Sequence, residues 1–501
     1  MPPHASYLFK HALVQDAAYG TLLREPRRAL HARIADTLES QFAEIAENRP
    51  ELLARHLTEA RLIEKAAALW AKAGQRSLER SALVEATVQL TRALDQIATL
   101  PGTPARRGEQ IKLQVALTNA LMHVKGHASS DAKASLAKAQ QCIEQAETLG
   151  ETLEDPLLLF SVLYGFWIAN FMAFDGNVLK DLASQFLAFA EKQSGTAPLM
   201  MAHRIMGMCL LYCGDVAEGK AHLDRALLLY DPDQHRQLAT RFVVDAGPTI
   251  LSYRSLALCI LGYPDAALLD ADRALSIAKE TGHTATLIVA LLFAAMLNIF
   301  RGHYTLAKLQ ADELIALSEQ TGALFWKQSG LHVQGSIFAM TGQASQAVAL
   351  ISPRITEAQA TGTSIGLPRY LTHLAISHAE LGEFYEASCC IGRATAALEK
   401  ANERWEEAEV HRVAGEIALI SSTLDPPRAE AYFERALAVA RRQQAKFWEL
   451  RAAMSLARLW RDQGKVQQAR ELLAPVYGWF TEGFDTRDLK EAKALLEELA
   501  A

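Results

Sequence analysis

Cysteine is scarce in this chain, which has six cysteines among its 501 residues and no Cys-x-x-Cys pair. A disulfide framework needs a higher density of cysteine, and a structural zinc site needs ligand pairs at short spacing. We therefore expect reduced thiols in the core, a cytoplasmic location and no bound metal.

An excess of charge of either sign is also missing. Lys and Arg total 51, Asp and Glu total 57, and the formal net charge is -6, so the chain has no general attraction for nucleic acid. One basic cluster consists of Arg24, Arg27, Arg28 and Arg33, but Pro26 interrupts it and no aromatic stacking pattern accompanies it. We interpret it as a solvated or protein-facing helix surface rather than a DNA contact, and expect no nucleic-acid partner.

No continuous apolar segment of a secretory signal occurs between Met1 and Leu30. The stretch from Pro156 to Phe174 has no charge and is nearly long enough to cross a membrane. Asp155 and Asp175 flank it, and acidic flanks disfavour a cytoplasmic anchor. We predict a helix covered by its neighbours on both sides, and no membrane partner.

A phosphate-binding loop is matched only in part. Gly214 to Lys220 fits the pattern GxxxxGK, but Ala221 follows where that loop has the hydroxyl residue that holds magnesium. Residues 200–213 predict a helix, whereas the loop follows a strand. We interpret this segment as a turn between two helices.

Histidine pairs give no ligand set either. His123 and His127 lack a third ligand nearby in the sequence, and His373 and His378 do not share a helix face well. We assign no catalytic, cofactor-binding or metal-binding residue, expect no cofactor, and predict that this chain is not an enzyme.

What the chain does contain is an internal repeat with a period of about 40 residues, in the range of helical-hairpin arrays. One column holds small residues: Gly207, Ser255, Ala295, Gly335, Ala375, Gly415 and Ala457. Seven positions later comes a turn position, at Gly214, Gly262, Gly302, Gly342, Gly382, Ser422 and Gly464. An alanine follows five positions after several of these, at Ala267, Ala307, Ala347, Ala387 and Ala469.

Each repeat predicts two antiparallel helices. Pro264 begins one helix, alanine and leucine recur in it at helical spacing, and Gly282 ends it. The small residues allow the backbones of the two helices to approach where they cross. The predicted fold is all-α: an α-solenoid, or right-handed superhelix, of about ten helical hairpins.

These spacings resemble the tetratricopeptide repeat, which has a small residue at its eighth position, glycine near its fifteenth and alanine at its twentieth. That motif is about 34 residues long, and longer helices account for the greater period found here. Similar long repeats occur in the regulatory arms of large signalling ATPases, such as the maltose-regulon activator of the LuxR type.

The beginning of the chain differs from the repeats. The string FKHALVQDAAY from Phe9 to Tyr19, followed by basic residues to about Ile34, resembles a segment of bacterial STAND ATPases fused to class III nucleotidyl cyclases. There it lies between the nucleotide-binding region and helical repeats, so the resemblance implies the C-terminal part of such a protein, without its cyclase and ATPase domains. We expect three regions: 1–60 with this segment, 61–480 with the repeats, and 481–501 as a capping helix.

The densest aromatic cluster includes Tyr164, Phe166, Trp167 and Phe171. It is either helix core or the lining of an inner groove for a protein, a peptide or a small effector. The predicted function is a protein-interaction or effector-sensing module that regulates an attached cyclase or ATPase. The alternative is the effector-binding arm of a LuxR-type transcription activator without its DNA-binding domain.

Overall fold

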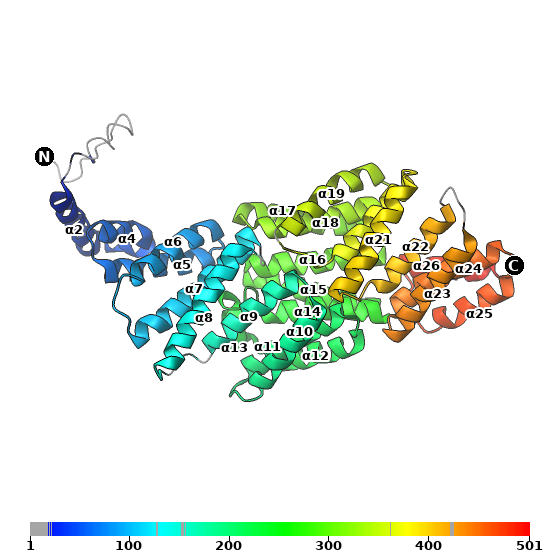
Figure 1. Ribbon diagram of the computed structural model, residues 1–501, viewed down its shortest axis with the longest axis horizontal. Helices are drawn as coiled ribbons and strands as arrows, with labels where there is room; N and C mark the ends of the chain where they lie inside the picture. Colours follow the sequence, from blue (N-terminus) through cyan, green and yellow to red (C-terminus); the bar gives the residue numbers. More distant parts are fainter. Residues whose placement is uncertain are drawn as a thin grey trace.

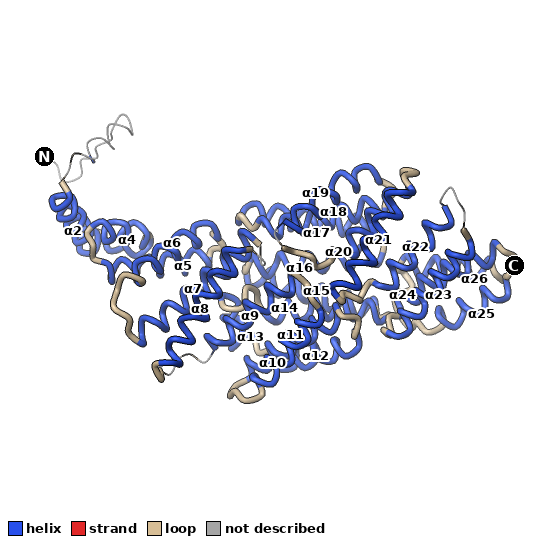
Figure 2. The backbone as a smooth tube through the Cα atoms, viewed as in Figure 1, coloured by secondary structure: helices blue, strands red, loops and turns tan. Residues whose placement is uncertain are grey.

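A computed structural model describes residues 19, 21, 23–126, 129–151, 155, 157–360, 362–420 and 425–500, apart from the side chain of Thr240. The expected all-α solenoid is confirmed, because helices make up most of these residues and none of them lies in a strand (Figure 2). The helices stack along one long axis, with the N-terminal helices at one end and the C-terminal helices at the other (Figure 1).

Ten consecutive hairpins form the stack in the described residues, each with a first helix A and a second helix B. They are α5 (Ile63–Glu79) with α6 (Leu83–Ile97), α7 (Pro104–Lys125) with α8 (Ser130–Thr148), α9 (Leu157–Met172) with α10 (Gly176–Ala190), α11 (Thr196–Tyr212) with α12 (Val216–Leu229), α14 (Ala246–Leu261) with α15 (Pro264–Thr281), α16 (Thr284–Arg301) with α17 (Tyr304–Thr321), α18 (Leu324–Met340) with α19 (Ala344–Ala360), α20 (Leu367–Glu380) with α21 (Phe384–Ala401), α22 (Glu407–Ile420) with α23 (Pro426–Arg442), and α24 (Lys446–Asp462) with α25 (Val466–Tyr477).

Other helices lie at the two ends and at one interruption. The N-terminal helices are α2 (Arg24–Gln41), α3 (Ala43–Asn48) and α4 (Pro50–Glu59), and the C-terminal helix is α26 (Arg487–Glu498). The interruption between α12 and α14 contains α13 (Pro232–His235) and a short 3-10 helix, η1 (Arg236–Thr240). The division of the chain near residues 60 and 480 stays a prediction, and residues 1–18, which carry most of the N-terminal string, lie outside the described residues.

The small-residue column lies where helix A crosses helix B. A Cβ atom on Gly335 of α18 would lie 2.6 Å from Cγ1 of Ile351 in α19, and one on Gly415 of α22 would lie 2.4 Å from the Phe433 ring. Gly207 of α11 is equally close to Leu223 of α12, at 2.7 Å. The remaining members are fully buried: Ser255, Ala295, Ala375 and Ala457.

Hydrogen bonds join segments of the superhelix that are far apart in the sequence. The carbonyl oxygen of Met172 accepts from the backbone N–H groups of Ser364 and Ile365, and that of Tyr212 accepts from those of Arg404 and Trp405. Met172 and Ser364 are as far apart in the sequence as Tyr212 and Arg404. This separation corresponds to nearly five repeats, so one full turn of the superhelix closes on the next.

The C-terminal end closes on the middle of the chain in the same way. Oε1 of Glu482 accepts from the backbone N–H groups of Asp265 and Ala266, in the first turn of α15, at 2.9 and 3.1 Å. Gly302 has φ of 81°, and a Cβ atom on it would lie 2.7 Å from Cβ of Arg487. Glycine is therefore required there by the left-handed backbone and by the contact between turns.

The helix α16 is long and apolar enough to cross a membrane by length and composition alone, and 72% of its apolar window is buried inside the protein. Burial of this kind is typical of the core helix of a globular protein. The uncharged stretch singled out in the sequence forms the shorter α9, whose side chains are mostly buried, and Pro156 lies outside the described residues.

Candidate functional site: a cavity inside the superhelix

The closed turn surrounds a cavity of about 90 Å³, which we call the central cavity. Its wall comes from α9, α11, α14, α16, α18 and α20, together with residues 243–244 and Trp405. Met172, Tyr212, Ile365 and Trp405 both line it and take part in the backbone hydrogen bonds between turns. The cavity therefore depends on closure of the turn.

Arg204 of α11 contributes a buried positive charge to the wall. It is 1% exposed, and its Nη2 donates to the Tyr164 hydroxyl at 3.1 Å. Its Nη1 lies 3.8 Å from the sulfur of Met201, and its Nε has no hydrogen-bond partner. No carboxylate among the described residues forms an ion pair with Arg204, so this guanidinium is buried without a counter-charge.

Arg369 of α20 also lines the wall. Its guanidinium lies over the rings of Tyr370 and Trp405, at 5.2 and 5.5 Å from their centroids, and its Nε also lacks a partner. Burial, the largest effect, opposes the charge of Arg369, but attraction to Glu406, Tyr370 and Tyr212 together outweighs it, so the pKa of Arg369 is raised. Arg369 thus has a carboxyl group in its surroundings.

Aromatic side chains form much of the rest of the wall. Tyr253 lies against Phe293 with ring centroids 4.4 Å apart, and Tyr212 contacts Trp405 at 5.4 Å. Burial raises the pKa of Tyr253, and the Arg204 charge opposes part of that rise. The wall therefore offers the Tyr164 hydroxyl beside the Arg204 charge and aromatic rings elsewhere.

Two buried carboxyl groups lie behind Arg369. Burial raises the pKa of Glu403 to about 7, although its carboxylate accepts from the N–H groups of Gly366 and of the Trp405 ring. Burial also raises the pKa of Glu406 to about 8, where Arg369 and Arg451 favour the ionised form, and Glu403 and Glu409 oppose it. Near neutral pH these groups only partly neutralise Arg369.

A second cavity, of about 320 Å³, lies nearer the C-terminus and is lined by charges of both signs. Nε of Arg412 donates to Glu409 at 2.8 Å, and its Nη1 donates to Glu416 at 3.1 Å. Arg451 pairs with Glu409 at 3.1 Å, so the arginines here have partners within the protein. The arginines of this cavity are therefore neutralised by glutamates of the protein and do not require an anionic ligand, in contrast to Arg204 in the central cavity.

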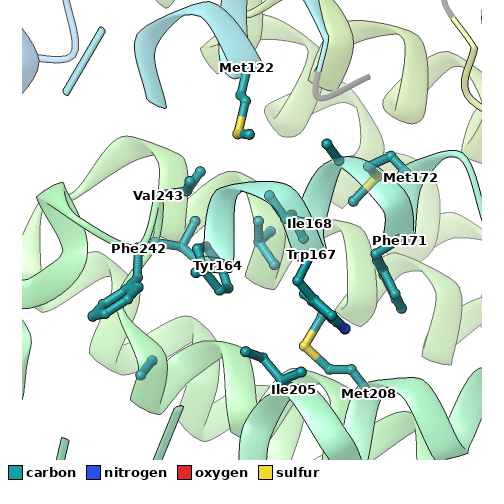
Figure 3. Packing of buried hydrophobic residues seen from close by; sticks show 14 of the residues in the cluster. Met122, Tyr164, Trp167, Ile168, Phe171, Met172, Ile205, Met208, Phe242 and Val243 are labelled. Carbon is teal, nitrogen blue, oxygen red and sulfur yellow. The ribbon is translucent and has the colours of Figure 1, made fainter. Parts of the chain in front are cut away.

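The four aromatic residues proposed for a groove have different positions. Tyr164 and Phe171 line the central cavity. The Trp167 ring points from α9 toward Ile205 and Met208 of α11 and is 1% exposed (Figure 3). Phe166 packs against the cluster around Ile111 and Val162. The groove assignment thus applies to Tyr164 and Phe171 at most, and it stays a prediction.

Sequence reasoning missed Arg204, Arg369 and the contribution of residues 242–244. Phe242 packs edge-on against Tyr164 at 5.4 Å (Figure 3), and Val243 and Val244 line the cavity. Arg204 did have a signal, because it is the one arginine in the otherwise apolar run of α11. The interruption after α12 was visible only as a lengthened repeat.

The segments compared above with a phosphate-binding loop and with metal ligands take part in a turn, an ion pair and a hydrogen bond. Gly214 lies in the turn between α11 and α12, and Lys220 pairs with Asp224 at 2.8 Å. The ring of Trp326 donates to Nδ1 of His123 at 2.8 Å, whereas His127 lies outside the described residues.

His373 and His378 have separate surroundings. His373 lines a small cavity next to Arg369, while His378 contacts Glu383 at 2.5 Å. The described residues contain no group of three or more side chains suited to a metal ion.

No protein-family model matches the chain. It is 24% identical over 242 residues, 48% of its length, to an uncharacterized protein of Rhizobium meliloti (strain 1021), and the match spans 23% of that protein. A Rap protein complexed with Competence and Sporulation Factor is similar in structure, with a TM-score of 0.51 and 13% identity, over 78% of this chain and 99% of that chain. The APC/C component complex Cut9–Hcn1 has a TM-score of 0.47 and 14% identity, over 98% and 99%.

At these identities the likeness concerns the fold. Together with the hairpins described above, it shows that the chain is a tetratricopeptide-like helical-repeat protein.

Proposed function

We propose that this chain is an effector-sensing module whose ligand occupies the central cavity. The observation that supports this most directly is Arg204, a buried guanidinium without a carboxylate partner in the wall of a cavity. Burying an unpaired charge is costly, and binding sites are where proteins retain such groups. We propose no catalytic role for the chain itself.

Ligand binding in the central cavity would be coupled to closure of the superhelix. The cavity wall combines residues from α9 and α11 with residues from α18 and α20, which belong to successive turns. A ligand that contacts both turns stabilises the closed form by its preference for that form. The closed and open forms would present different outer surfaces to attached domains or protein partners.

The chain, in this proposal, is the regulatory part of a larger signalling protein of the cyclase–ATPase type, acting in the cytoplasm. The string from Phe9 to about Ile34 supports this assignment, as does the relative from Rhizobium meliloti, which is much longer than the matched region. The second candidate, the effector arm of a LuxR-type activator, is favoured by the long repeats alone.

The test uses the dialysable small-molecule fraction of a bacterial cell extract as the probe. We expect it to raise the melting temperature and to slow hydrogen exchange at the amides of Ser364, Ile365, Arg404 and Trp405, which join the turns. Ser329 lines the cavity, so Ser329→Phe should fill it and abolish both effects.

The matched control is Ser276→Phe, because Ser276 is exposed on α15. It should respond to the extract as the parent does. No response in the parent chain, or an equal response in Ser329→Phe, would contradict the proposal.

A further inference from the structure

We infer that the ligand of the central cavity is a small carboxylic acid with a short apolar body, and that Arg204 binds its carboxylate. This inference rests on the proposed function and specifies the chemical class of the effector.

The first argument is a comparison of Arg204 with another deeply buried arginine of the chain. Arg301 is 3% exposed, and its guanidinium donates to the carbonyl oxygen of Pro264 and contacts Asp265 and Asp485. Arg204 is less exposed and has only a tyrosine hydroxyl and a thioether. The chain therefore pairs the buried Arg301 with carboxylates, whereas Arg204 at the cavity has no carboxylate partner among the described residues.

The second argument is the geometry of the donors around Arg204. A carboxylate can accept two hydrogen bonds from one guanidinium in parallel, which is the strongest pairing that arginine offers. Arg204 lines the cavity, its Nε has no hydrogen-bond partner, and the Tyr164 hydroxyl accepts from its Nη2. A neutral or cationic ligand would leave the charge of Arg204 unpaired.

The third argument concerns the body of the ligand. Around Arg204 the wall is apolar, with Met208, Val289, Leu292 and Phe293 among the lining side chains. A volume of about 90 Å³ is smaller than the roughly 150 Å³ cavity that binds benzene in another protein, so the body of the ligand is smaller than an aromatic ring, such as a short branched chain.

One carboxylate per ligand is favoured over two. Arg369, the other arginine of the wall, already donates to the Tyr370 hydroxyl at 3.5 Å and lies over the rings of Tyr370 and Trp405. A second carboxylate on the ligand would have to draw Arg369 away from these contacts. A monocarboxylate satisfies Arg204 and leaves the contacts of Arg369 unchanged.

The experiment is isothermal titration of the full chain with probes of one shape and different charge. The probes are 2-methylpropanoate, 2-methylpropanamide and 2-methylpropylamine, and then 3-methylbutanoate and its amide. We expect each acid to bind at least tenfold more tightly than its amide, and 2-methylpropylamine not to bind. This comparison uses the unaltered protein and so does not depend on the stability of a variant.

Arg204→Met tests the residue itself and should remove the preference for the acid over the amide. Arg204→Lys keeps a charge without the paired donors and should retain part of the preference. Arg225→Met is the matched control, because Arg225 is exposed on α12, and it should bind as the parent does.

Three outcomes would overturn the inference. If the amides bind as tightly as the acids, the cavity binds ligands but not by charge, and the proposed function stands. If the cell extract stabilises the chain while none of the probes binds, the ligand belongs to another class and only this inference fails. If neither the extract nor any probe binds, both proposals fail.

Discussion

Replacing Gly335 tests how the two helices of one hairpin pack. A Cβ atom at this position would lie 2.6 Å from Cγ1 and 3.3 Å from Cδ1 of Ile351, which is fully buried. We expect Gly335→Leu to lower the free energy of unfolding by about 3 kcal/mol, near the upper end for overpacking. That loss would exceed the gain of about 0.8 kcal/mol from removing glycine from a helix.

The matched control is the same substitution at Gly392 in α21. Gly392 is exposed, and a Cβ atom there would meet no other atom within 4 Å. Only the helix-propensity gain remains, so Gly392→Leu should stabilise the chain by about 0.8 kcal/mol. Urea titration followed by circular dichroism measures both variants. If Gly335→Leu unfolds at the same urea concentration as the parent, the crossing of α18 and α19 is wrong.

Three further predictions concern charged groups. Burial raises the pKa of Glu406 to about 8, against 4.5 for an ordinary glutamate. At a pH between these two values, Glu406 keeps its proton in the folded chain and has lost it in the unfolded chain. Stability should therefore fall as pH rises from about 5 to 8, and Glu406→Gln should melt above the parent at pH 8 and level with it near pH 4.5. Glu482→Gln weakens the cap at the start of α15, so the amides of Asp265 and Ala266 should exchange faster, with a loss of about 1 kcal/mol. Equilibrium dialysis should detect negligible ATP binding both before and after Lys220→Ala, because Lys220 pairs with Asp224 on the same helix. ATP binding that depends on Lys220 would refute this.

The repeats could be predicted from the sequence because their signal is local. Gly335 and Gly415 recur with the period of the hairpins, and each makes its close contact with the next helix. Positions of this kind depend only on helix geometry and on contacts between neighbouring segments.

The central cavity could not be predicted in the same way. It brings Arg204 and Arg369 to one wall, although four repeats separate them, and its closure depends on hydrogen bonds such as that from Ser364 to Met172. Whether successive turns meet depends on small rotations added up over many repeats, which no single residue specifies. The aromatic cluster was visible, but its members are not distinguished by helical spacing: Tyr164 and Trp167 lie one turn apart with stacked rings, and of the two only Tyr164 lines the cavity.

The central claim is that a small carboxylate binds to Arg204 inside the closed superhelix. The most direct measurement is a crystal structure of the chain with 3-methylbutanoate. The claim predicts electron density for the ligand in the central cavity, with the carboxylate within hydrogen-bond distance of the Arg204 guanidinium. A ligand bound only on the outer surface, or a carboxylate in the cavity that points away from Arg204, would contradict it.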